Sequence, residues 1–280
     1  MTRSHVSFPR GQHFFPSEAS VSWTDAHGIN RCSGACMRQV WYRVTGKGEA
    51  SKPDPYSEWI FALGKAVEII LVEQWKQMGI WVDNNIKFYD KEHNISGEID
   101  VLLRDPGTSE LLLAEVKSFY GYMATKDLCG NTKVVGHPKT SQLLQTLIYI
   151  DLGQKLGILN YGKMVYYARD SASRTEFDVT IVDDGINRRP CVNGEIDYRF
   201  TMEDIYKRYI TLAEHTYANT EPPRDYQIAW SPDKIKIMNS IGEVSKTAMA
   251  DYTKNPSKNP IGDWQCRYCK FSEYCYKDNH

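Results

Sequence analysis

The chain is 280 residues long, with 41% hydrophobic and 12% aromatic residues, which is enough to bury a sizeable core in one large domain or two small ones. Lys plus Arg (34) nearly balances Asp plus Glu (35), so any nucleic-acid contact must come from a local basic groove and not from bulk charge. Residues 1–20 carry no apolar signal core, and no stretch approaches the ~18 apolar residues of a membrane span. We therefore expect a soluble, unsecreted, cytoplasmic protein without a membrane partner.

Hydrophobic spacing in the first half of the chain predicts a long helix followed by a β-hairpin. Asp54-Pro55 can start a helix that Gly79 ends, because apolar residues recur between them at three- and four-residue spacing. Two β-prone runs within Ile95–Phe119 then flank a turn at 104–108 that contains Asp-Pro-Gly. Pro fixes φ and Gly accepts a positive φ, so this turn closes a hairpin.

Residues 120–140 lack a period, which predicts a long loop. It leads to a second helix from about Thr140 to Leu156, whose apolar residues lie at helical spacing. Beyond it the pattern predicts two strands and a third helix, at Lys163–Arg169, Thr175–Val182 and Met202–Ala218. From Glu221 onward Pro, Lys and Asn become more frequent, and the chain reaches a cysteine-rich C-terminus.

An acid–lysine arrangement stands on the predicted hairpin. Side chains alternate along a strand, so Glu115 and Lys117 project to one face of the second strand and Val116 to the other. Antiparallel pairing can bring Asp100 of the first strand close to Glu115. Converging carboxylates repel each other unless a cation lies between them, and Mg²⁺ prefers such oxygen ligands. A bound ion would activate water for phosphodiester hydrolysis, while the Lys117 ammonium orients that water or stabilises the developing charge.

The alternative is an ordinary hairpin with a surface Asp and a surface Glu-Lys pair, since a Glu-x-Lys sequence often occurs by chance. The apolar run Leu111–Val116 argues against it, because ionisable residues on a strand buried on both faces are costly unless they serve a site. Gly194–Asp197 repeats the letters of Gly97–Asp100, but no Glu-x-Lys strand follows it. We assign that second copy no function.

Together with two helix motifs, this hairpin resembles the PD-(D/E)xK nuclease superfamily and specifically its RecB-like branch. Members carry a Gly followed four residues later by His or Glu, and Gly64 and Glu68 match this motif, with Glu68 where many members have His. Gln145 and Tyr149 match a Gln-x-x-x-Tyr motif, whose spacing puts both side chains on one helical face. Taken separately, a solvated Glu, a surface Gln and a buried Tyr are the simpler interpretation of these helices. The motifs cover Gly64 to Tyr149, a little under a third of the chain.

The resemblance implies an α/β fold with a restriction-endonuclease-like core, in which helices flank a mixed central sheet. It implies a single RecB-like nuclease domain over residues 1–280, with the core at about 54–185 and cluster-binding segments at about 30–45 and 260–280. The implied catalytic residues are Glu68, Asp100, Glu115, Lys117, Gln145 and Tyr149, and the implied Mg²⁺ or Mn²⁺ ligands are Glu68, Asp100, Glu115 and Val116. The resemblance implies a DNA exonuclease that acts 5′ to 3′ on single strands, and it leaves endonuclease activity open.

Three of the seven cysteines have C-x2-C-x5-C spacing, as Cys266, Cys269 and Cys275. In a reducing compartment this favours metal ligation over disulfides, and a tetrahedral ion or a cubane cluster needs a fourth thiolate. The segment Cys36–Tyr42 resembles the Cys-x-Arg-x-x-x-Tyr segment that supplies it in iron–sulfur RecB-like nucleases. These include the AddB nuclease domain and the CRISPR-associated exonucleases of the fourth Cas family. Cys32 is the alternative fourth ligand.

By resemblance the cysteines hold a 4Fe-4S cluster, with zinc as the alternative because four thiolates suit it too. Ligands near residues 36 and 270 close a loop of about 230 residues, which costs the unbound chain on the order of 5 kcal/mol in entropy. We therefore expect a structural staple that joins the N- and C-terminal segments. Cys129 and Cys191 are expected to be ordinary small apolar or surface residues.

The segment after Lys117 combines aromatic and basic residues, among which Tyr120, Lys133 and Lys139 are candidate DNA contacts. A merely solvated loop is the equal alternative. Three functions stay open: a DNA exonuclease of replication, recombination or repair, encoded by a virus or mobile element; a nuclease that trims DNA for CRISPR adaptation; and a catalytically idle DNA-binding or assembly module with structural zinc. The expected partners are DNA with free ends or single strands and recombination or CRISPR-adaptation proteins. Intact Asp100, Glu115 and Lys117 argue against the idle module.

Overall fold

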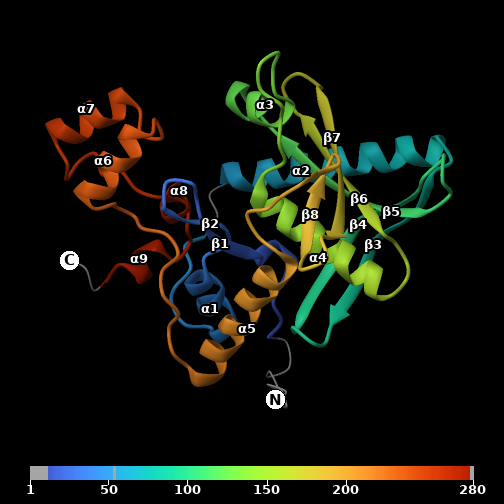
Figure 1. Cartoon of the computed structure of the whole chain (residues 1–280), viewed down its shortest axis with the longest axis horizontal. Helices are drawn as coiled ribbons and strands as arrows, with labels where there is room; N and C mark the ends of the chain where they lie inside the picture. Colours follow the sequence, from blue (N-terminus) through green and yellow to red (C-terminus); the bar gives the residue numbers. More distant parts are fainter. Residues whose placement is uncertain (1–11, 53–54, 278–280) are drawn as a thin grey trace. The chain divides into compact units, whose positions relative to one another are not determined.

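A computed structural model describes residues 12–52 and 55–277 of the chain. The chain divides into two compact units, which are treated separately below. Unit 1 comprises Met1–Ala35 and Pro53–Thr220, and unit 2 comprises Cys36–Lys52 and Glu221–His280. Figure 1 shows the helices and strands of both. None of the described helices is long and apolar enough to span a lipid bilayer.

A seven-stranded sheet forms the centre of unit 1 (Figure 1), in the order β3-β4-β5-β6-β7-β8-β9. Its strands are β3 (Trp81–Asp90), β4 (Ile95–Arg104), β5 (Leu111–Phe119), β6 (Tyr161–Ala168), β7 (Arg174–Asp183), β8 (Arg188–Val192) and β9 (Glu195–Ile196). The β5–β6 pair is parallel, and the other neighbouring pairs are antiparallel. A parallel pair needs a crossover connection, and helix α4 (Thr140–Lys155) lies within it. The expected mixed sheet flanked by helices is confirmed.

Helix α2 (Pro55–Gln77) covers one face of this sheet with its C-terminal half. Val67, Leu71 and Trp75 recur at helical spacing and pack in one buried cluster with Val101 of β4 and Val116 of β5. Helix α4 contacts β5, β6 and β7, and most of its side chains are buried. Residues 112–116 of β5 are therefore buried as a continuous run, as the apolar sequence of that strand predicted.

Four smaller elements complete unit 1 besides the 3-10 turn at Pro16–Glu18. They are the antiparallel pair β1 (Ser20–Thr24) and β2 (Asn30–Gly34), helix α3 (Tyr122–Cys129) and helix α5 (Met202–Ala218). The predicted helices at α2, α4 and α5 and the hairpin β4–β5 are confirmed. The predicted loop over 120–140 is wrong at α3, because the buried side chain of Leu128 anchors a short helix that has little periodicity of its own.

Unit 2 consists of short helices around the cysteine-bearing segment. They are α1 (Met37–Thr45), α6 (Pro232–Ser240), α7 (Lys246–Lys254), α8 (Trp264–Arg267) and α9 (Ser272–Cys275). The ring of Tyr42 on α1 packs against Phe271 and Tyr274, with centroids 5.4 and 5.2 Å away. The backbone N–H of Met37 donates to Asp225 Oδ2 at 2.7 Å. These contacts fix helix α1 to the Glu221–His280 segment of its own unit at two places.

Candidate active site and cysteine pocket

The register of the β4–β5 hairpin places Asp100 opposite Glu115. The last paired residues are Val101 and Ala114, so the next step along both strands brings these two acids face to face. The ladder stops there, and Oδ2 of Asp100 instead accepts a hydrogen bond from the backbone N–H of Val116 at 3.1 Å. The two carboxylates therefore meet where β4 and β5 begin to separate.

Glu115 is a fully buried carboxylate whose polar partner is an ammonium. Its exposed fraction is 0%, and Oε2 accepts no hydrogen bond from a described residue. Lys117 Nζ forms an ion pair with Oε1 at 2.5 Å. Burial and the neighbouring charge of Asp100 raise the pKa of Glu115 to about 7, although Lys117 opposes the shift. This carboxylate is poised to change charge near neutral pH.

Lys117 and Asp100 lie beside Glu115 and are half-buried. Burial disfavours the charged form of Lys117, but the carboxylates of Glu115 and Asp100 outweigh it and raise the pKa of the ammonium. Burial raises the pKa of Asp100, against the opposing charge of Lys117. The site therefore keeps one fixed positive charge between acids that resist ionisation.

Glu68 joins this group from helix α2. Its negative charge raises the pKa values of both Asp100 and Glu115, so it lies within electrostatic reach of each. Its Oε1 is 2.5 Å from Nζ of Lys65 one helical turn earlier. A Cβ added to Gly64 would lie 3.5 Å from Ser118 Oγ, which shows how closely this turn of α2 approaches β5. The Gly64–Glu68 motif thus brings a third carboxylate to the strand pair.

The Gln145–Tyr149 pair of helix α4 lies within electrostatic reach of the same acids. Gln145 Nε2 donates to the Tyr149 hydroxyl at 3.1 Å, and the Tyr149 ring packs edge-on against Phe88 with centroids 5.3 Å apart. Burial and then the charge of Glu115 raise the pKa of Tyr149. The two helix motifs and the hairpin motif, far apart in sequence, therefore surround one group of charges.

The remaining expected site residues are placed less centrally. Val116 contributes its backbone N–H to Asp100, while its side chain is buried in the α2-facing core. Tyr120 is 66% exposed just beyond β5, and Lys133 and Lys139 are exposed in the segment before α4. Glu98, two residues before Asp100 on the same strand, was not predicted, and its charge raises the pKa of Tyr149. The i,i+2 spacing on a strand would have indicated it.

The acids of this site are of a type that binds a divalent cation, although their oxygens are not arranged around one point. Within residues 12–52 and 55–277, no three His, Cys, Asp or Glu side chains are placed so that they could together hold a metal ion. Yet buried carboxylates that lie close together disfavour each other's ionised form, and a cation is the usual compensation. Glu68, Asp100 and Glu115 supply the hard oxygen ligands that Mg²⁺ and Mn²⁺ prefer, so these residues fit such an ion.

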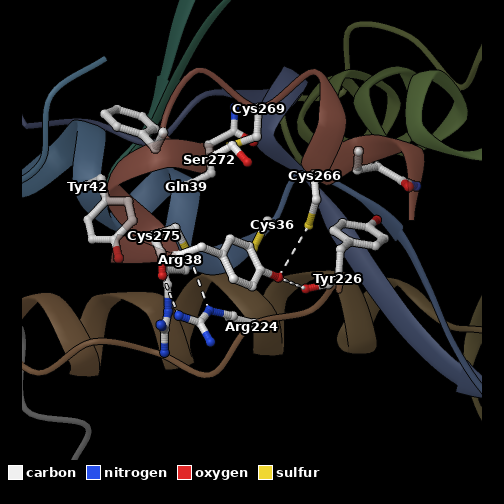
Figure 2. Close-up of a pocket in the computed structure, with 13 residues that line it drawn as sticks. Cys36, Arg38, Gln39, Tyr42, Arg224, Tyr226, Cys266, Cys269, Ser272 and Cys275 are labelled. Carbon is white, nitrogen blue, oxygen red and sulfur yellow. Dashed lines mark hydrogen bonds between the residues drawn. The ribbon is translucent and has the colours of Figure 1, made fainter. Parts of the chain in front are cut away.

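Four cysteines of unit 2 line a single pocket (Figure 2): Cys36, Cys266, Cys269 and Cys275. The pocket holds about 380 Å³ of empty space, counted with its opening to solvent. Burial raises the pKa values of three of these thiols, to about 11 for Cys266. Backbone amides in the first turn of α1 act in the opposite direction on Cys36 and favour its thiolate. Four thiols that line one cavity are the donor set that an iron–sulfur cluster or zinc requires, although no three of them lie at ligand distances from one common point in the described part of the chain.

The other cysteines lie elsewhere. Cys32 is in β2 of unit 1, where Arg208 Nη2 donates to its sulfur at 3.9 Å, and it does not line the pocket. Cys129 is exposed and Cys191 is buried, as expected for a surface residue and a small apolar residue. None of the seven cysteines forms a disulfide bond.

Comparison with known proteins gives no family. No protein-family model matches the chain, and no protein with a curated description matches it. Among solved structures, the chain is similar to one titled "Crystal structure of SSO0001", with a TM-score of 0.44 and 14% identity over 96% of this chain and 88% of that chain. A likeness at that level carries no argument about chemistry, which must come from the side chains themselves.

Proposed function

We propose that this chain is a Mg²⁺- or Mn²⁺-dependent deoxyribonuclease of the RecB-like PD-(D/E)xK type, which acts as an exonuclease on DNA. The observation that carries the proposal is Glu115, a fully buried carboxylate that faces Asp100 and forms an ion pair with Lys117. Several acids beside one ammonium leave an excess of negative charge, which a divalent cation would compensate. Two further acids and a half-buried ammonium beside Glu115 are the parts that phosphodiester hydrolysis requires.

Each side chain has a distinct task in this chemistry. Glu68, Asp100 and Glu115 would hold the ion, which when bound supplies a Lewis acid and a water of lowered pKa. The Lys117 ammonium, held in place by Glu115, orients the attacking water and stabilises negative charge that develops on the phosphate. The backbone N–H of Val116 fixes the orientation of Asp100. The hydrogen bond between Gln145 and Tyr149 would hold this side of α4 in place near the acids.

Two features of unit 1 support DNA as the substrate. Tyr120 is exposed directly beyond the strand that carries Lys117, where an aromatic ring can stack on an unpaired base. Lys133 and Lys139 are exposed in the segment that leads into α4, where they can contact phosphates. Stacking with backbone contacts tolerates any sequence and favours single strands or frayed ends.

We also propose that the four pocket cysteines hold a 4Fe-4S cluster, with zinc as the alternative occupant. The support is the donor set: four thiols from α1 and from the C-terminal segment line one cavity. Their expected role is structural, because they lie in unit 2 and the carboxylates lie in unit 1.

The nuclease proposal is tested with DNA labelled separately at the 5′ and 3′ ends, single-stranded and double-stranded, in Mg²⁺ or Mn²⁺. The wild type should release short 5′-labelled products from single strands and leave closed circular single strands largely intact. Asp100→Asn and Lys117→Met should both abolish cleavage, whereas Asp178→Asn, at an exposed acid that pairs with Lys163 on β6, should not. Equal cleavage by all four proteins would place the activity outside this site, and no cleavage by any would favour an idle module.

A further inference from the structure

Arg224 is a half-buried arginine whose guanidinium is directed at a cysteine sulfur (Figure 2). Its Nε–H donates to Cys275 Sγ at 3.3 Å, and one Nη donates to the backbone carbonyl of the same residue. The guanidinium also lies over the ring of Tyr276, 4.3 Å from its centroid. No carboxylate among the described residues pairs with Arg224. The guanidinium of Arg224 therefore has a cysteine sulfur in the place where an arginine commonly has a carboxylate.

A second side chain, that of Tyr276, approaches a pocket sulfur from the position next to Cys275. The hydroxyl of Tyr276 is 3.7 Å from Cys266 Sγ. That hydroxyl is fixed in place, because it accepts from the backbone N–H of Ile228 at 3.0 Å and lies 3.3 Å from the carbonyl of Tyr226. Arg224 at Cys275 and Tyr276 at Cys266 are therefore two side-chain contacts to pocket sulfurs from outside the cysteine set.

We infer that Arg224 is an outer-sphere residue of the metal centre, which holds the Cys275 sulfur in its ligating orientation and raises the reduction potential of the cluster. This inference rests on the proposal that the four cysteines bind metal. Hydrogen bonds to ligand sulfurs and nearby positive charge stabilise the more negative, reduced state of an iron–sulfur cluster. Arginine suits the task because its fork can contact Sγ and the carbonyl of one residue together, and it keeps its charge when buried. Tyr276 supports it with a weaker, neutral contact at Cys266.

The test uses the full-length protein purified without oxygen, as wild type, Arg224→Gln, Arg224→Lys and Tyr276→Phe. Arg267→Gln is the matched control, since Arg267 is an arginine of the same unit whose guanidinium contacts the Pro260 carbonyl and no sulfur. Iron and sulfide are counted per chain. The rate of cluster loss in air is followed by absorbance, and the midpoint potential of one-electron reduction by dithionite is followed by electron paramagnetic resonance.

Arg224→Gln should lose its cluster about tenfold faster than wild type and show a more negative midpoint potential. Arg224→Lys keeps the positive charge, so its midpoint potential should lie close to that of wild type. It should still lose its cluster faster than wild type, because lysine lacks the fork that contacts both Sγ and the carbonyl of Cys275. Tyr276→Phe should shift both quantities less, and Arg267→Gln should match wild type. A potential in Arg224→Gln equal to that of wild type, or equal changes in Arg267→Gln, would overturn the inference.

Failure of the cluster proposal is distinguishable from failure of this inference. A colourless wild type with one zinc per chain rejects the cluster, and zinc transfer to a chelator then replaces cluster loss as the measurement. Faster transfer from Arg224→Gln than from Arg267→Gln would still support the outer-sphere role. Identical transfer rates would reject that role.

Discussion

Asp100 and Glu115 face each other across the β4–β5 hairpin, one step beyond the last hydrogen-bonded pair of that ladder. Their meeting depends on register alone, since a slip of one residue would turn every side chain of one strand to the opposite face. The turn at 105–108, where Asp105 Oδ1 accepts from the amides of Gly107 and Thr108, holds that register. Local turn chemistry therefore determines whether two carboxylates can share a cation.

The raised pKa of Glu115 predicts a pH-dependent loss of stability in metal-free protein. The folded state binds this proton up to a pKa of about 7, against the ordinary glutamate pKa of 4.5 in the unfolded chain. Its contribution to the free energy of unfolding therefore falls as pH rises from about 4.5 to about 7, and is constant outside that window. Glu115→Gln, which resembles the protonated form, should become more stable than wild type by on the order of 3 kcal/mol above the window.

Urea unfolding in EDTA at about pH 5 and about pH 8 measures this difference. The difference in free energy of unfolding between Glu115→Gln and the wild type should be small at the lower pH and large at the higher pH. Added Mg²⁺ at the higher pH should stabilise wild type more than Glu115→Gln, because the variant lacks one of the three carboxylates that would hold the ion. A gap that does not change with pH would show that Glu115 is charged throughout.

Lys117→Met should separate metal binding from catalysis. The ammonium is surrounded by acids that raise its pKa, so the wild type carries a fixed positive charge in the site. Its removal should lower the cleavage rate at least about 100-fold, since charge that develops on the phosphate loses a stabilising partner. Stabilisation by Mg²⁺ in thermal unfolding should persist or increase, because the carboxylates keep no competing cation. Lys163→Met, on the surface of β6, serves as control, and loss of Mg²⁺ stabilisation in Lys117→Met would contradict the assigned role.

Tyr149→Phe removes the hydroxyl that accepts from Gln145 and leaves the ring on Phe88. The lost hydrogen bond should cost about 1 kcal/mol of unfolding free energy. Cleavage should fall by about tenfold or more if the pair positions the site, because small displacements near reacting groups are expensive. Tyr161→Phe is the control, because it removes a comparable hydrogen bond between the first residue of β6 and Asp105 in the β4–β5 turn. It should lower the free energy of unfolding and leave the cleavage rate unchanged. Equal activities in the two variants would make Tyr149 purely structural.

The sequence predicted those parts of the fold that follow from local periodicity. Val67, Leu71 and Trp75 repeat at helical spacing, and the Asp-Pro-Gly turn determines its hairpin without help from the rest of the chain. Strand β3 was missed, because its first half reads Trp-Val-Asp-Asn-Asn, has a register shift between Trp81 and Asp83, and places Asn85 at φ 56°. Its partner strand β4 supplies the pairing that its own residues do not indicate.

The candidate site was predictable in its acids and not in their surroundings. Glu68, Asp100 and Glu115 could be identified from motif spacing, and the register now places two of them opposite each other. The contact of Arg224 with Cys275 joins residues 51 positions apart, and no periodicity connects them. Helices α6 and α7 carried readable signals, since Ser231 and Ser245 cap them by accepting from Lys234 and Ala248. Their Pro- and Asn-rich flanks concealed those signals.

Replacing Cys36 and Cys32 separately should identify the fourth metal ligand. Cys36 lines the pocket with Cys266, Cys269 and Cys275, while Cys32 pairs with Arg208 in unit 1. Cys36→Ser should therefore lose most of its iron and sulfide, or zinc, and unfold at a lower temperature, because three thiolates leave one ligand position open. Cys32→Ser has the same change of atom and should keep the metal content of wild type. Full metal content in Cys36→Ser together with loss in Cys32→Ser would move the ligand from α1 to β2.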